Sequence, residues 1–196
     1  MPARRDALGF GMTGFIFALL ATLLAGIGAR DQMTVAALAL RQGQRPGLLG
    51  IAVLTSIATA AFAAYAGLKV APLLSANARM IFAAIALALA GDESLLLRPK
   101  HLPEEPTQSL GATAIVLTAH QLTDAARFLV FAIAVATAAP IPAGLGGAVG
   151  GAATVTAGWL LAAELGRLPL VAARRMIGVV LLALAVWLAL RALGRA

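Results

Sequence analysis

The stretch LLAGIGARDQMTVAALAL, residues 23–40, decides how this sequence is interpreted, because it places charge inside an apolar run. The run is interrupted by Arg30, Asp31 and Gln32 and then resumes through Leu40. Charged groups are costly inside a hydrocarbon environment, and those found there mark a functional pathway by default. We therefore expect this break to belong to a functional site.

The composition predicts an all-α integral membrane protein that crosses the bilayer several times. Of the 196 residues, 61% are hydrophobic and 12% are charged. A soluble domain carries about 25% charged residues, whereas a membrane-spanning helix needs about 20 consecutive apolar ones. The lipid bilayer is the expected partner. The many arginines and alanines are typical of a GC-rich bacterial gene, so we expect the membrane to be a bacterial inner membrane.

Several functional classes are not expected from this composition. The chain has no cysteine, so it offers no thiolate nucleophile and no cysteine-bound metal. Its net charge of +7 is spread over loops and chain ends, which does not predict nucleic-acid binding. We find no nucleophile–base pair and no cofactor fingerprint, so neither an enzyme nor a resident cofactor is predicted. A homodimer remains open.

The apolar segments divide the chain into two sets of three. Six of them are recognisable, and a polar segment with three prolines and four acidic residues separates the third from the fourth. We expect a first three-helix repeat at 1–91, a polar linker at 92–109 and a second repeat at 110–196. The six segments are 8–40, 47–67, 73–91, 110–138, 143–165 and 170–192.

The two halves resemble each other in sequence. ANARMI at 76–81 matches AARRMI at 172–177, an offset of 96. The polar break at 26–32 has a counterpart 95 residues later, at 121–127. Because each half has an odd number of crossings, the halves are predicted to be inverted repeats, as in many secondary transporters.

Glycines are concentrated in AGLGGAVGGAATVTAG, residues 143–158. Several of them are four residues apart, which places them on one helix face and lets another backbone approach closely. A P-loop would need a preceding strand and a following lysine, and the segment has neither. We expect a tight helix–helix contact here.

The polar side chains at membrane depth are the candidate site. If the two breaks meet near the midplane, where such transporters bind substrate, they form one cluster. We consider Asp124, Gln121, Asp31 and Gln32 as candidates for binding a substrate cation, Arg30 and Arg127 as charge-pairing residues, and His120 as a proton relay or a packing histidine.

Two breaks of this kind resemble those of the Gdt-type family, manganese/calcium–proton exchangers of the lysine-exporter superfamily. Its members carry Glu-x-Gly-Asp-(Lys/Arg)-(Thr/Ser), usually followed by Gln, in the first helix of each inverted half. The copies fall on GIGARDQ, residues 26–32, and QLTDAAR, residues 121–127. The neighbouring segments DQMTVAALALRQGQRP (31–46) and LGRLPLVAARRMIGVVLLALAVWLAL (165–190) are also similar to the family's sequence.

The first copy of the motif is altered at three positions. Gly28, Arg30 and Gln32 fit the family pattern. The family's glutamate, aspartate and hydroxyl residue are replaced by Gly26, Ala29 and Asp31, respectively.

The second copy keeps only its aspartate, Asp124. Gln121 stands in place of the glutamate, so three of the four metal-binding carboxylates that the resemblance implies are absent. The remaining positions of the motif are Thr123, Ala125, Ala126 and Arg127.

The charges of the two breaks leave three interpretations open. Asp31 and Asp124 balance Arg30 and Arg127, whereas Mn²⁺ and Ca²⁺ favour several anionic oxygens. In the first interpretation, Asp124 and Gln121, helped by Asp31, still bind a small cation or metal ion for proton-coupled transport. In the second, the charged pairs hold the broken helices together in a structural or accessory protein. In the third, the site carries a different small solute.

Overall fold

The computed structural model describes residues 2–96 and 109–194, and every regular element in these two ranges is helical. The expectation of an all-α protein is confirmed for this part of the chain. The elements are α1 (Pro2–Gly26), α2 (Arg30–Gln42), α3 (Pro46–Val70), η1 (Ala71–Leu73), α4 (Ala76–Leu96), α5 (Leu110–Leu122), α6 (Ala125–Thr137), α7 (Pro140–Leu160), α8 (Ala162–Leu165) and α9 (Leu170–Ala192).

The first polar stretch breaks a helix, as its sequence predicts. Helix α1 ends at Gly26 and α2 starts at Arg30, with a bend of 57° between their axes. Gly28 lies in the break with φ +66°, a left-handed conformation that glycine adopts without steric cost. The chain can therefore turn here and begin a new helix directly.

The second polar stretch breaks a helix in the same way. Helix α5 ends at Leu122 and α6 starts at Ala125, so only two residues separate them. The first residues of α2 and α6, Arg30 and Ala125, are 95 positions apart, which is the offset between the two polar stretches in the sequence. The structure thus repeats a broken helix in each half of the chain.

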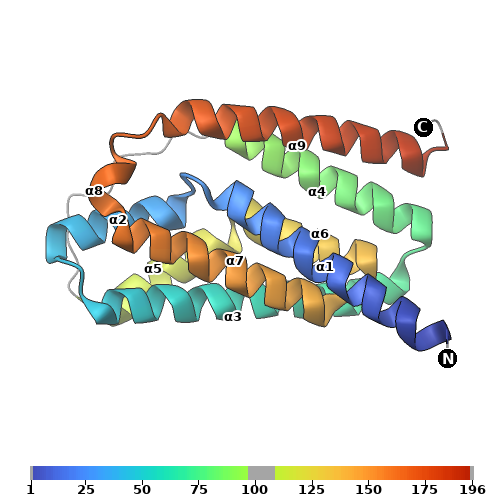
Figure 1. Ribbon diagram of the computed structural model, residues 1–196, viewed down its shortest axis with the longest axis horizontal. Helices are drawn as coiled ribbons and strands as arrows, with labels where there is room; N and C mark the ends of the chain where they lie inside the picture. The colour runs from blue at the N-terminus through green and yellow to red at the C-terminus, as the bar shows by residue number, and fades with distance from the viewer. Residues whose placement is uncertain (1, 97–108, 195–196) are drawn as a thin grey trace.

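The long elements alternate in direction along the molecule (Figure 1). The α1–α2 pair, α4 and α7 run one way, whereas α3, the α5–α6 pair and α9 run the other way. The start of α1 and the end of α9 consequently lie at the same end of the molecule. Helix α4 packs along α9, and α7 packs along both α1 and α3.

Glycines make the closest of these contacts, as the glycine-rich segment predicts. A Cβ on Gly146 would collide with the Phe15 carbonyl of α1, and one on Gly147 would collide with Val130 of α6. The α4–α9 pair crosses at Gly91 and Gly178, where a Cβ on Gly178 would lie 2.8 Å from the Gly91 carbonyl oxygen. Small residues therefore set the separation of these helices.

Length and composition make some of the helices compatible with a membrane. Pro46–Leu73 and Leu170–Ala192 are each long and apolar enough to cross one, and the bent pair Met12–Gly26 and Arg30–Gln42 would make a third span. Helices α5 and α6 are apolar but have 13 residues each, about 20 Å, whereas the hydrocarbon core is about 30 Å thick. The break thus shortens each piece below a full span. Six separate spans are not established by this criterion.

The outer surface is rich in large apolar side chains. Phe17 is 54% exposed, Phe62 62% and Trp187 51%, and they lie on three different helices. Extended exposed apolar surface marks membrane or protein contact. The surface therefore supports association with a membrane.

Helix α4 extends further than the sequence predicts. Residues 92–96, expected in the polar linker, form its last turn and a half, and Ser94 among them is buried. Residues 97–108 of that linker lie outside the described residues. The acidic side chains just after Gly91 therefore belong to a packed helix.

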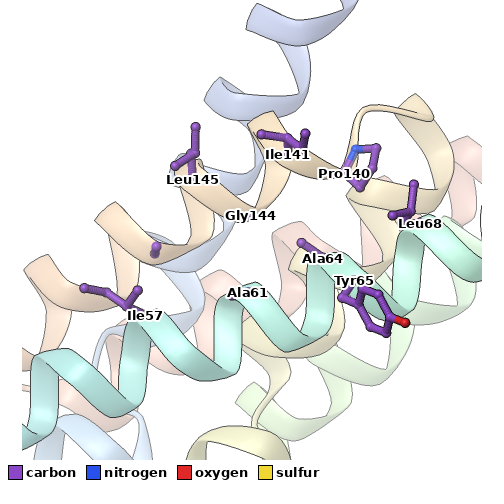
Figure 2. Close-up of a pocket in the computed structure, with 10 residues that line it drawn as sticks. Ile57, Ala61, Ala64, Tyr65, Leu68, Pro140, Ile141, Gly144 and Leu145 are labelled. Atoms are coloured by element: carbon purple, nitrogen blue, oxygen red, sulfur yellow. The ribbon is translucent and has the colours of Figure 1, made fainter.

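A pocket of about 330 Å³ lies on the outer side of α3 and α7 (Figure 2). Its walls include Ile57 and Leu68 of α3 together with Ile141 and Leu145 of α7. None of its ten lining residues is charged, so the pocket suits an apolar chain and offers nothing to hold an ion.

Candidate functional site

The two helix breaks lie against each other, as the sequence predicts. Gln121 Nε2 donates to Asp31 Oδ2 at 3.5 Å, and Arg30 donates to the Thr123 carbonyl oxygen at 3.4 Å. Each contact joins one break to residues more than 80 positions away. The cluster is therefore created by the fold.

Most of the expected site residues are buried. Asp31, Gln32, Gln121, Asp124 and Arg127 are each at most 5% exposed. The Arg30 side chain differs, because 43% of it is exposed. Arg30 therefore lies at the edge of the cluster, and the acidic groups lie behind it.

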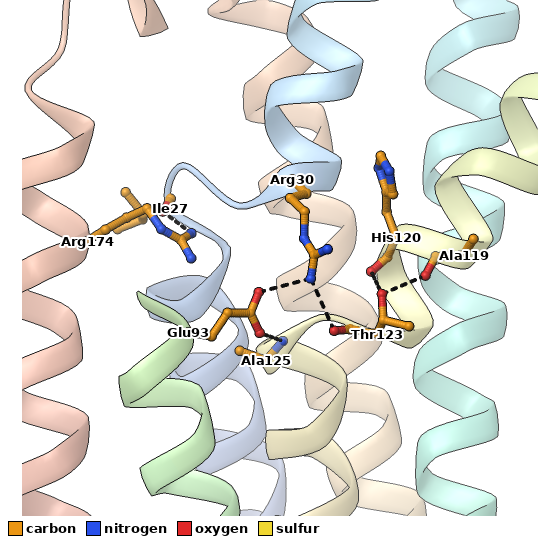
Figure 3. A network of polar contacts seen from close by, with 8 residues as sticks. All are labelled: Ile27, Arg30, Glu93, Ala119, His120, Thr123, Ala125 and Arg174. Atoms are coloured by element: carbon orange, nitrogen blue, oxygen red, sulfur yellow. Dashed lines mark hydrogen bonds and ion pairs between the residues drawn. The ribbon is translucent and has the colours of Figure 1, made fainter. Parts of the chain in front are cut away.

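Glu93 joins the site from α4, and the sequence did not indicate it. Its Oε1 lies 3.4 Å from Arg30 Nη2, and its Oε2 accepts a 2.9 Å hydrogen bond from the Ala125 backbone N–H (Figure 3). A carboxylate at a helix N-terminus satisfies a free N–H and is favoured by the helix dipole. Glu93 thus binds the first residues of α2 and α6 at once.

Arg127 is held by α3. Its Nε donates to Thr59 Oγ1 and its Nη2 donates to Ser56 Oγ, both at 2.8 Å. Gly151 of α7 leaves room for the guanidinium, because a Cβ there would lie 2.8 Å from Nη2. Arg127 therefore acts on the site's carboxylates as a fixed positive charge.

The ion pairing differs from the pairing of arginines with aspartates that the sequence suggested. Arg30 pairs with Glu93, and the hydrogen bonds of Arg127 go to α3. The physical reason is the packing of the helices: α4 places Glu93 beside Arg30, and α3 places its hydroxyl groups beside Arg127. Asp31 and Asp124 remain close enough to act electrostatically on Arg127.

Asp124 occupies the N-cap position of α6 without making a side-chain cap hydrogen bond. Within the described residues, its Oδ1 is buried and has no hydrogen-bond partner. The charged groups that act on its carboxyl are Asp31, Glu93 and Arg127. A buried acceptor without a donor is rare in native structures. The Glu93 carboxyl lies within side-chain hydrogen-bonding reach of Asp124, so a proton held between the two acids would supply a donor.

Gln32 stabilises the conformation of the first break with two hydrogen bonds. Its Oε1 accepts a 2.7 Å hydrogen bond from Gly28 N, and its Nε2 donates to the Thr154 carbonyl oxygen at 3.3 Å. Both ends of the amide are therefore engaged, one within the break and the other on α7.

His120 faces the first break from the end of α5. Its Nδ1 lies 3.3 Å from Thr34 Oγ1, and its side chain is half-buried. The structure thus connects His120 to α2 through a hydroxyl, a contact that suits both of its expected roles.

Arg174 of α9 also contacts the first break. Its Nη1 donates to the Ile27 carbonyl oxygen at 3.3 Å, and the residue is only 4% exposed (Figure 3). It therefore satisfies one of the carbonyls left free where α1 ends.

Glu93 changes the charge of the site. Three carboxylates, those of Asp31, Asp124 and Glu93, now face the two guanidiniums of Arg30 and Arg127, so the formal sum is −1. In the described parts of the chain, no three His, Cys, Asp or Glu side chains come together as a possible metal site. The three carboxylates thus leave a formal charge of −1, but their oxygens are not gathered around one point as a hard divalent ion requires.

Comparison of the chain with protein-family models, with curated proteins and with solved structures gave no match.

Proposed function

We propose that the protein is a multi-pass membrane transporter of small cations, coupled to protons, with Asp124 as its principal cation-binding residue. The observation that carries the proposal is the buried Asp124 Oδ1, which has no hydrogen-bond partner among the described residues and lies where two broken helices meet. Discontinuous helices that meet in this way are typical of secondary transporters.

The proposed membrane arrangement is two inverted three-helix repeats, with each broken helix counted as one crossing. The alternating directions of the long elements and the common end for the start of α1 and the end of α9 support it. The location would be a bacterial inner membrane. Arg30, which is half-exposed, would line an aqueous opening, since a charge facing hydrocarbon costs at least ~2.5 kcal/mol.

The charge of −1 favours a single monovalent cation or a proton over Mn²⁺ or Ca²⁺. One such ion neutralises the three carboxylates and two guanidiniums, whereas a divalent ion would leave an excess charge in a buried site. The resemblance to the Gdt-type family supports the substrate class and the proton coupling. The replaced carboxylates support a change in ion preference.

The test is uptake by purified protein in vesicles that enclose a pH-sensitive dye, with Na⁺, K⁺, Mn²⁺ or Ca²⁺ outside. Wild-type protein is expected to move protons against Na⁺ or K⁺, and D124N is expected to abolish this exchange. D92N is the matched control, because Asp92 is an exposed acid on α4. Wild-type vesicles that exchange none of these ions would overturn the proposal.

A structural role is the second candidate, supported by the hydrogen bonds that fix Arg127 to α3. The effect of D124N on the unfolding free energy distinguishes the transport role from the structural role. Because Asp124 Oδ1 makes no hydrogen bond within the described residues, a transport role predicts that D124N changes the unfolding free energy by less than about 1 kcal/mol. A structural ion pair predicts a loss of about 3–5 kcal/mol.

A further inference from the structure

We propose that Glu93 is the gate of this site, and that its release from Arg30 opens the route by which a small monovalent cation reaches Asp124. The inference rests on the proposed function for the identity of the ion, but the gate itself is a property of the fold. It assigns a role to a residue of α4 that lies outside both polar breaks.

The gate follows from the order in which the groups are buried. Arg30 is 43% exposed and Glu93 is 14% exposed along their side chains, whereas Asp124 is 3% exposed. The Arg30–Glu93 pair therefore separates the accessible edge of the cluster from its buried acidic interior. Figure 3 shows the pair between the break in the first helix and the start of α6.

Glu93 connects the two broken helices to each other. One of its oxygens pairs with Arg30 at the start of α2, and the other accepts from Ala125 N at the start of α6. Arg30 closes the connection by donating to the Thr123 carbonyl oxygen, next to the start of α6. These contacts join the start of α2 to the start of α6.

A substrate cation can take the place of the Arg30 guanidinium in its pair with Glu93. An arriving cation competes with the Arg30 guanidinium for the same Glu93 oxygen, and the freed guanidinium has exposed surface in which it can be hydrated. Pairs of this kind, partly exposed and at 3.4 Å, contribute little to stability and so open easily. Glu93 thus serves as the first contact for the ion and Asp124 as the second.

Helix α4 links this contact to α9, against which it packs. The two helices cross at Gly91 and Gly178, only two residues before Glu93, and Arg174 of α9 holds the Ile27 carbonyl oxygen. One small displacement of the α4–α9 pair would therefore act on both sides of the first break.

The absence of native cysteine permits a direct test by thiol labelling. Gln121 is 0% exposed, so Q121C places a thiol inside the closed site. The probe is a small cationic methanethiosulfonate reagent applied to purified protein in detergent. Q121C alone is expected to react slowly, and Q121C combined with E93Q about fivefold faster, the factor expected when a partly exposed ion pair is lost.

Two controls define the result. Adding D92N to Q121C removes the same charge one residue away, from an exposed position, and is expected to leave the labelling rate unchanged. N77C provides an exposed thiol at the start of α4, far along that helix from Glu93, whose rate is expected to be high and equal in all backgrounds. A rate for Q121C that is the same with and without E93Q, or that D92N raises equally, would overturn the gate.

A second variant keeps the test decisive if E93Q does not yield folded protein. R30Q removes the other member of the pair and is expected to raise the Q121C rate by the same factor. The double change of Arg30 and Glu93 is expected to add nothing, because the two side chains share one interaction. The labelling requires no transport, so a protein that shows the gate but moves no ion would refute the proposed function alone.

Discussion

The Oε1 atom of Gln32 accepts a 2.7 Å hydrogen bond from Gly28 N, across the point where the first helix breaks. A side chain from the new helix thereby satisfies a backbone donor that the bend has left without a helical partner. The break is thus a formed element of the structure with its own hydrogen bonds.

The first prediction concerns this bond. Gln32→Leu is expected to lower the unfolding free energy by about 1–3 kcal/mol, because Gly28 N–H is left buried without an acceptor. Thermal unfolding in detergent measures the loss. Gln44→Leu is the control, since Gln44 is exposed and water replaces its bonds to α7. An equal loss in both variants would contradict the role of Gln32.

The second prediction concerns the space beside Arg127. Gly151→Ala is expected to cost about 1–3 kcal/mol, because its Cβ would lie 2.8 Å from Arg127 Nη2 and would also collide with Ser56 Oγ. The comparison is Gly50→Ala on α3, which has nothing within 4 Å and is expected to be neutral or stabilising by up to about 1 kcal/mol. Chemical unfolding of the two variants side by side provides the measurement.

The third prediction concerns the hydroxyl that holds Arg127. Thr59→Val keeps the shape of the side chain but removes the acceptor of the Arg127 Nε hydrogen bond, so a loss of about 1.5–3 kcal/mol is expected. Thr113→Val removes a buried hydroxyl that donates to the carbonyl oxygen of Ser109, the N-cap residue of its own helix. It is expected to cost under about 1 kcal/mol. If the two losses were alike in unfolding experiments, Thr59 would have no special part in placing the charge.

The fourth prediction separates backbone strain from contact at Gly28. Gly28→Ala and Gly194→Ala both force alanine into positive φ, at +66° and +68°. Each is expected to cost about 1–2 kcal/mol for that reason. Gly28→Ala is expected to cost more, because its Cβ would lie 3.3 Å from Arg174 Cδ, whereas nothing lies within 4 Å at Gly194. Equal shifts in melting temperature would show that Arg174 gives way freely.

The positions of both breaks could be predicted because polar residues stand out in an apolar run. Their contact could be expected too, because the repeat places them at equivalent points, and Gln121 does reach Asp31. Glu93 could not be found this way. In sequence it lies beside Asp92 at the start of an acidic, proline-containing stretch, and only the continued winding of α4 to Leu96 brings it to Arg30.

The sequence also did not reveal which residues bind the two arginines. Charge balance alone paired Arg127 with an aspartate, but the guanidinium lies against Ser56 and Thr59. Serine and threonine are common in apolar helices, where their hydroxyls bond to the preceding turn, so they gave no signal of a site. Which hydroxyl faces an arginine depends on helix rotation, and rotation is set by packing.

The glycine face of α7, which includes Gly146 and Gly147, affects how its neighbours can slide along it. Where Gly146 meets the Phe15 carbonyl and Gly147 meets Val130, α7 contributes backbone only, without side chains that interlock with the neighbours. Interlocked side chains resist axial sliding because each must change rotamer to pass the next, and a smooth face removes that resistance. That resistance remains where the Thr154 side chain of α7 lies against Gly26 of α1, so a shear of α1 along α7 would first have to displace Thr154.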